Sequence, residues 1–336
     1  MTAPTVRLSG PEDLIAVVPH LFGYAVTESI LAIDLIPANP TRLGFMARID
    51  LPAEGEATEA ANTLTSAMLR HGQGIVCLIG YETVTGEALT GLVMTGDAMR
   101  AAGVNVFDQL IVTGDRWRSL GCSDTECCPT EGKPVPGADH PAALALIGTG
   151  SAPVKDRQTL ADHIAASPRA ATVMDVITDQ RDEASTTLES AAAAWGAVLT
   201  STDPLTDQTI ATAALGLTLG ERKQFRDTLL AWMTPGVLDL EQTDPTCLTH
   251  LRALQPATPD TLTAPCEAVT DRLITLCASI PDSEATPALT VLAHYAWING
   301  KGTIASLALD RALAAQPDYT LARLLDRMVS AGIRLR

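Results

Sequence analysis

Apolar residues recur with two different spacings along the first 120 residues, one typical of strands and the other of helices. Short apolar runs predict strands at 29–36, 43–51, 75–79 and 106–112, the last leading into 116–120. A helix start is marked by Ser9 followed by Pro11, and helical spacing marks 56–71 and 86–102; Gly23 and Gly72 are positioned to end the first two helices. This order predicts an α/β domain over residues 1–150, with a mixed β-sheet covered by helices.

The strand pattern disappears after about residue 156, and helical runs follow one another to the end of the chain. They cover 156–166, 178–199, 207–219, 221–233, 261–279, 287–299, 303–315 and 321–331. Several prolines between Thr234 and Pro259 favour an internal linker there. Residues 151–336 are therefore expected to form an all-helical domain, and the whole chain to be α/β plus all-α.

One part of the helical half has the spacing of a tetratricopeptide (TPR) helix. Ala305, Leu309, Ala312 and Pro317 match the small, large, small and proline positions of the second helix of that motif. No comparable match lies one repeat earlier, so we expect a single TPR-like helical hairpin, with a repeat array as the alternative. A protein partner bound through the helical domain follows as an expectation, and the oligomeric state stays open.

Composition narrows the function classes. The 336 residues carry 23 Lys plus Arg against 39 Asp plus Glu, a formal charge of −16, which disfavours general binding to nucleic acid or to anionic membrane surfaces. The amino terminus has no signal-peptide pattern, and the most apolar stretch, 14–36, is interrupted by polar residues. A cytoplasmic protein without membrane spans is the expectation. The isolated cysteines Cys77, Cys247, Cys266 and Cys277 lie in apolar runs and are expected to be mostly buried and reduced.

The chemistry-bearing segment lies in the loop predicted at 115–141, at the edge of the α/β domain. Cys122, Cys127 and Cys128 place three thiols within seven residues, and nearby Arg116, Arg118 and Lys133 would lower their pKa. Three interpretations stay open. The cysteines with His140 could bind zinc, although this spacing is not a standard one. They could form a redox or nucleophilic site, or they could be structural.

The same segment resembles a known family. The residues that carry the resemblance are Arg116, Trp117, Arg118, Ser119, Cys122, Asp124, Cys127, Cys128, Pro129, Glu131, Gly132 and Pro134. Further matches are 11–14, Pro19, Leu21, Gly23 and Ser29, then 48–52, and late in the chain 296–297, Gly300, Ala305, 308–309, 312–313, Pro317 and 321–322. Together they resemble the actinobacterial family called domain of unknown function 4192 (DUF4192). The resemblance implies a cytoplasmic protein with this two-part layout and supplies no activity.

Acidic residues on the predicted strands suggest another chemistry. Asp34, Asp50 and Asp108 fall on three strands, and Glu56 and Glu59 begin a helix. Strand carboxylates that hold divalent metal are typical of ribonuclease-H-like nucleases. The two glutamates are equally explained as charges that favour a helix N-terminus. The nuclease interpretation is kept as a hypothesis for the structure to test.

The sequence therefore predicts a non-enzymatic binding or interaction protein with no cofactor and with unknown catalytic residues. The alternative is an enzyme or small-ligand binder, with zinc as one ligand, centred on the loop 116–136. Its candidate ligand-binding residues are Arg116, Trp117, Arg118, Cys122, Cys127 and Cys128; its candidate metal ligands are Cys122, Cys127, Cys128 and His140.

Overall fold

The structure is a computed structural model that describes residues 7–38, 41–53, 55–72, 75–148, 151–219, 223–254 and 266–333. The chain divides into two compact units, Met1–Arg157 and Gln158–Arg336. Each unit is described by itself.

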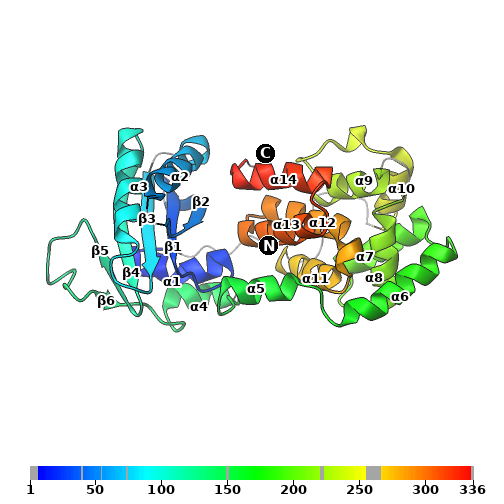
Figure 1. The fold of residues 1–336 in the computed structure, drawn as a ribbon, viewed down its shortest axis with the longest axis horizontal. Helices are drawn as coiled ribbons and strands as arrows, with labels where there is room; N and C mark the ends of the chain where they lie inside the picture. Colours follow the sequence, from blue (N-terminus) through cyan, green and yellow to red (C-terminus); the bar gives the residue numbers. More distant parts are fainter. Residues whose placement is uncertain are drawn as a thin grey trace. The chain divides into compact units, whose positions relative to one another are not determined.

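The first unit is built on a six-stranded sheet (Figure 1). Its strands are β1 (Ser29–Ile36), β2 (Arg42–Asp50), β3 (Ile75–Glu82), β4 (Asn105–Thr113), β5 (Arg116–Ser119) and β6 (Lys133–Pro134). They lie in the order β2-β1-β3-β4-β5-β6, and only β3 and β4 are parallel to each other. The sheet is therefore mixed, and β6 forms one of its edges.

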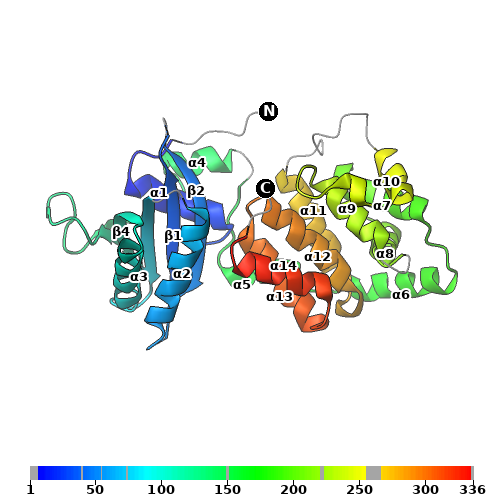
Figure 2. The same ribbon diagram turned by 90° about the horizontal axis from the view of Figure 1, so that it is seen from above.

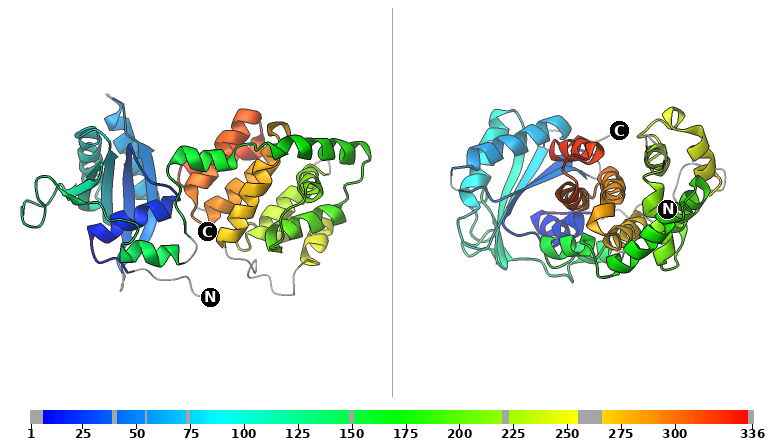
Figure 3. Two further views of the ribbon diagram at one scale, coloured as in Figure 1. Left: turned by 90° about the horizontal axis from the view of Figure 1, so that it is seen from below. Right: turned by 45° about the vertical axis from the view of Figure 1, so that its right-hand side comes forward.

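Helices cover both faces of this sheet (Figure 3). They are α1 (Pro11–Phe22), α2 (Ala57–His71), α3 (Leu89–Ala101) and α4 (Pro141–Ile147). On one face α2 and α3 contribute Leu64, Met68, Leu92 and Met99 to a core that includes Ile30 of β1. On the other face lies α1, which contacts α4 and ends at Gly23 in the left-handed conformation that favours glycine. The predicted fold class is confirmed.

Two short elements of this unit were not predicted. The strand β6 has only two residues, too few to show an alternating pattern. The helix α4 follows the loop and begins at Pro141, a residue suited to the first helical position because its missing N–H has no partner there. The loop predicted at 115–141 therefore ends where Pro141 begins a helix.

The second unit consists of helices (Figure 2). They are α5 (Arg157–Ile164), α6 (Arg169–Asp182), α7 (Leu188–Thr200), α8 (Asp207–Gly216), α9 (Gln224–Met233), η1 (Leu240–Gln242), α10 (Pro245–Arg252), α11 (Cys266–Ala278), α12 (Asp282–Ile298), α13 (Gly302–Ala315) and α14 (Thr320–Ser330). Every residue from 285 to 296 of α12 is buried, because α8, α9, α11, α13 and α14 all contact it. The central helix is α12.

Three sequence predictions for this unit were wrong in detail. The single helix expected at 178–199 is two helices, α6 and α7, separated by Ala184 with φ of 52° and by the cap that Thr187 provides for α7. Pro287 lies inside α12, which begins five residues earlier. The expected linker 234–259 contains η1 and α10, because Asp244 caps the N-terminus of α10; residues 255–259 lie outside the described part.

The TPR-like positions lie in α13, the helix that packs on α12. Ala305, Leu309 and Ala312 are fully buried, and Pro317 follows the end of α13. Small buried side chains let two helix backbones approach closely, which accounts for these residues by packing. Nothing in the structure tests a peptide partner. Within the described residues, no helix is long and apolar enough to cross a membrane.

The buried His294 of α12 makes stability depend on pH. Its Nε2 lies 3.0 Å from the hydroxyl of Thr234, and burial lowers its pKa from 6.5 to about 4. The unfolded chain therefore binds a proton at a higher pH than the folded one. This contribution to stability is full above pH 6.5 and is lost as the pH falls toward 4, by about 3 kcal/mol.

We predict that His294→Gln, which cannot titrate, weakens this pH dependence. Urea unfolding at pH 7 and pH 4 measures the loss of unfolding free energy in both proteins. The parent should lose about 3 kcal/mol more than the variant. Equal losses in the two proteins would show that His294 takes up its proton without unfolding.

Candidate functional site

The cysteine-bearing segment connects β5 to β6 at the edge of the sheet. These strands pair antiparallel, with Trp117 opposite Lys133 and Arg116 opposite Pro134. The intervening residues 120–132 contain Cys122, Cys127 and Cys128. Strand pairing fixes both ends of this connection. We call residues 120–132 the cysteine loop.

The start of the cysteine loop is anchored to β4. The Ser119 hydroxyl donates to the Asp108 carboxylate at 2.6 Å and accepts the N–H of Gly121 at 3.2 Å. The N–H of Leu120 continues the ladder by donating to the Gln109 carbonyl. Cys122 therefore leaves the sheet from a position that β4 defines.

Asp124 folds the middle of the cysteine loop into a turn. Its side-chain Oδ1 accepts the N–H groups of Glu126 at 2.9 Å and Cys127 at 3.3 Å. Its backbone carbonyl accepts the N–H of Cys128 at 2.7 Å. This arrangement is the turn-forming behaviour of an aspartate that bonds to backbone two residues on. It turns Cys127 and Cys128 back toward Cys122.

A second turn returns the chain to β6. The N–H of Gly132 donates to the Pro129 carbonyl at 2.8 Å, and Gly132 has φ of +78°. A Cβ at this position would lie 2.8 Å from the Trp117 carbonyl oxygen, so glycine is required both by conformation and by space.

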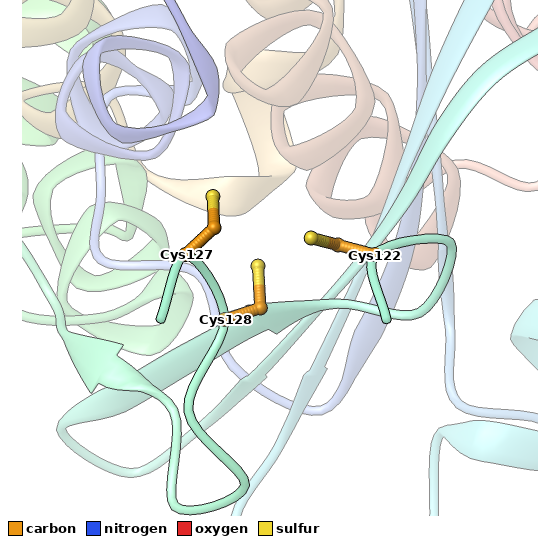
Figure 4. A group of neighbouring side chains, drawn as sticks. All are labelled: Cys122, Cys127 and Cys128. Carbon is orange, nitrogen blue, oxygen red and sulfur yellow. The ribbon is translucent and has the colours of Figure 1, made fainter. Parts of the chain in front are cut away.

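The two turns bring three sulfur atoms together (Figure 4). The Sγ atoms of Cys122, Cys127 and Cys128 all lie within 4.8 Å of one another, and all three thiols are free. Cys127 is exposed, and the other two are half-buried. Across the described ranges, this is the one group of three or more His, Cys, Asp or Glu residues whose ligand atoms come this close.

The three thiols differ in acidity. The pKa of Cys122 lies below the ordinary value, first because of a backbone hydrogen bond with Asp124 and then because of hydrogen bonds from Cys128 and Cys127. Partial burial raises the pKa of Cys128, and the neighbouring Cys122 raises it further. The cluster therefore favours one thiolate, at Cys122.

Two of the three basic residues have partners other than the thiols. The Arg116 guanidinium donates to the Gly132 carbonyl at 3.0 Å, and the Lys133 ammonium lies 5.6 Å from the centre of the Trp117 ring. The turn and the neighbouring thiols are the causes that lower the pKa of Cys122. Four acidic residues against three basic ones give segment 115–136 a net charge of −1, so it is not electropositive.

Trp117 is a core residue. Its side chain is buried, and its Nε1 has no hydrogen-bond partner in the described structure. Successive residues of a strand point to opposite faces, so Arg116 and Arg118 lie on the other face of the sheet from Trp117. The predicted ligand-binding set is therefore divided: the three cysteines converge, whereas the three β5 residues are split between the two faces of the sheet.

His140 lies away from the thiols. It precedes α4, where its Nδ1 accepts the N–H of Ala142, and its Nε2 lies 3.5 Å from the Asp13 carboxylate. Its ring is absent from the group of converging ligand atoms. The structure thus brings together three of the four candidate metal ligands.

The carboxylates of the nuclease hypothesis do not converge. Asp34 pairs with Val76 and Asp108 with Cys77, so the two aspartates lie on opposite faces of the sheet. Asp50 is exposed and paired with Arg48, and Asp108 anchors the cysteine loop. The strand-carboxylate metal site is therefore not formed, which argues against the nuclease hypothesis.

The cysteine loop lies within a segment that matches a known protein family. The family model described as domain of unknown function (DUF4192) matches residues 11–334, which include the whole cysteine loop. The chain belongs to the DUF4192 family. No match was found among the curated proteins or the solved structures. The DUF4192 description carries no activity, so the function of this chain is argued from the geometry of its site.

Sequence reasoning about this DUF4192 chain named Ser119, Asp108 and Asp124 but did not predict that they shape the site. The three residues hold the loop through hydrogen bonds. A local signal was present for Asp124, because aspartate is a common turn former whose side chain accepts backbone N–H groups a few residues further along the chain. The bond from Ser119 to Asp108 joins residues far apart in sequence and had no local signal.

Alkylation of the native, reduced chain should separate fast-reacting cysteines from slow-reacting ones. Cys122, Cys127 and Cys128 should react with iodoacetamide first. Cys77 and Cys277 are buried, and burial raises the pKa of each thiol to about 12, so both should react only after unfolding. Peptide mass spectrometry over time measures each rate. Labelling of Cys77 or Cys277 as fast as the cluster would contradict the structure.

Proposed function

We propose that this chain is a binding protein for a thiophilic metal ion, with zinc held by the thiolates of Cys122, Cys127 and Cys128. The observation that carries the proposal is the convergence of the three Sγ atoms within 4.8 Å. Thiolates are the ligands that soft and borderline metal ions such as Zn²⁺ prefer.

The spacing of the sulfurs supports the proposal. In a tetrahedral shell with zinc–sulfur bonds of about 2.3 Å, neighbouring sulfurs lie about 3.8 Å apart. Thiols within 4.8 Å of one another reach that separation by side-chain rotations and small loop movements. The exposed Cys127 and the half-buried Cys122 and Cys128 also leave the cluster accessible to an ion from solvent.

Charge favours a cation at this place. Segment 115–136 has a net charge of −1 within a chain of −16, so the surrounding field attracts cations and repels anionic ligands. The lowered pKa of Cys122 favours the thiolate form that binds a metal ion. Binding then requires the remaining thiols to lose their protons, so the affinity falls as the pH is lowered.

Three protein ligands leave a fourth coordination position for water or for another ligand. Structural zinc sites are usually closed by four protein ligands, whereas three are typical of sites with an open position. This difference supports ion binding with an accessible fourth position over a purely structural zinc. The protein partner expected for the helical unit stays a separate prediction.

We expect the metal-free, reduced chain to bind one equivalent of Zn²⁺ and to release protons on binding. Competition with a chromophoric chelator measures the affinity, and Co²⁺ as a spectroscopic stand-in reports thiolate ligation. Cys122→Ser, Cys127→Ser and Cys128→Ser should each weaken binding by more than the 10–100-fold that loss of a supporting outer-shell residue costs.

Two matched variants control this experiment. Ser123→Ala changes the same loop without removing a thiol, and Cys266→Ser removes a thiol from the helical unit. Both should bind Zn²⁺ as the parent does. A parent that fails to compete with the chelator, or cluster variants that bind as tightly as the parent, would overturn the proposal.

A further inference from the structure

We expect a disulfide formed within the cysteine cluster to include Cys122. Cys127 and Cys128 are consecutive, so their Cα atoms are about 3.8 Å apart. Disulfide-bonded residues usually have Cα atoms about 4.4–6.8 Å apart. A bond between Cys127 and Cys128 would therefore be strained, which leaves pairs of Cys122 with one or the other.

Cys122 is held ready for such a pair. It leaves β5 on one side of the loop, and the turn at Asp124 presents Cys127 and Cys128 from the other side. All three sulfurs lie within 4.8 Å, so a bond needs an approach of less than 3 Å to reach the S–S length of about 2 Å. The loop that closes is short and exposed, so little of the fold opposes the movement.

We propose that the cluster is an oxidation site at which a hydroperoxide converts Cys122 and either Cys127 or Cys128 into an intramolecular disulfide. This uses the side chains of the metal site, and its second half, the release of bound zinc on oxidation, rests on the proposed function. A disulfide removes two of the three thiolate ligands, and one remaining thiolate cannot hold the ion against solvent.

The reaction balances with the hydroperoxide as the only oxidant. One thiolate of the pair attacks a peroxide oxygen and the O–O bond breaks, so that sulfenic acid forms and hydroxide leaves, or an alkoxide where the hydroperoxide is organic. The partner thiolate attacks the sulfenic sulfur, the S–S bond forms, and a second hydroxide leaves. With hydrogen peroxide, two thiols and one peroxide give one disulfide and two waters. The sulfurs are oxidised, and the peroxide oxygens are reduced.

The remaining cysteines provide an internal comparison. Cys77 and Cys277 are buried. In the sequence, the cysteine nearest to Cys277 is Cys266, and the one nearest to Cys77 is Cys122. Neither belongs to a group of converging ligand atoms among the described residues. Burial shields both thiols from a peroxide in solution, so they should stay reduced under conditions that oxidise the cluster.

The test uses the full, reduced, metal-free chain and one equivalent of hydrogen peroxide, followed by alkylation and trypsin. Cleavage after Arg118 and Lys155 gives peptide 119–155, which contains all three cluster cysteines and no other, because Lys133 precedes a proline. We expect this peptide to lose two hydrogens and to carry one alkylated thiol. Three alkylated thiols, or a disulfide between two chains, would overturn the proposal.

Variants decide which pairs form. Cys122→Ser should abolish the internal disulfide, whereas Cys127→Ser or Cys128→Ser should keep it, because one partner for Cys122 remains. The control Ser123→Ala should oxidise at the parent rate. Circular dichroism confirms that each variant is folded. A disulfide that forms in Cys122→Ser as fast as in the parent would contradict the inference.

A second arm separates the two halves. Zinc-loaded chain is treated with hydrogen peroxide, and a chromophoric chelator reports zinc release, which should equal the disulfide formed. If the disulfide forms without zinc release, the proposed release of zinc on oxidation is overturned, whereas the proposed oxidation site is supported. A chain that never binds zinc overturns the proposed function, and the metal-free arm still decides whether the cluster is an oxidation site.

Discussion

The hydrogen bond between Ser119 on β5 and Asp108 on β4 is the contact on which the cluster depends. It fixes where the chain leaves the sheet, and the pairing of β5 with β6 fixes where it returns. Thirteen loop residues connect these two points, and the turn at Asp124 folds them back so that Cys127 and Cys128 approach Cys122. Fixed ends and one internal turn make one exposed and two half-buried thiols converge without a disulfide between them.

The position at an edge strand gives this arrangement its chemical character. A loop within the sheet core would bury the thiols and raise their pKa, as happens at Cys77 on β3. At the edge, the three sulfurs stay accessible to ions and small oxidants, while the anchoring of the loop to β4 and β5 keeps the sulfurs close to one another. The proposed zinc site and the proposed oxidation site use the same sulfur electron pairs, so metal binding and disulfide formation would compete in this loop.

Much of the fold was predictable because its signals are local. The β1–β2 hairpin, the helices α2 and α3 and most of the helical unit follow from spacing within a few residues. The break between α6 and α7 was missed because it depends on the positive φ of Ala184, a residue type that rarely adopts it, and on the cap that Thr187 provides. Pro287 inside α12 was missed because tertiary packing around that helix outweighs the lost hydrogen bond.

The site was predictable in composition and not in geometry. The three cysteines were identified as a group because they are close in sequence, and the structure brings them together. His140 was added on ligand type alone, yet it caps α4 and lies near Asp13, which no spacing rule could indicate. The contact between Ser119 and Asp108 depends on strand order, which local patterns do not determine.

X-ray absorption at the zinc edge of the chain loaded with one equivalent of Zn²⁺ tests the central claim most directly. Three sulfur neighbours at about 2.3 Å and one lighter atom are expected around the ion. Cys122→Ser should lower the sulfur count in the same spectrum. A shell of nitrogen and oxygen only, or four sulfurs, would contradict a site made by Cys122, Cys127 and Cys128.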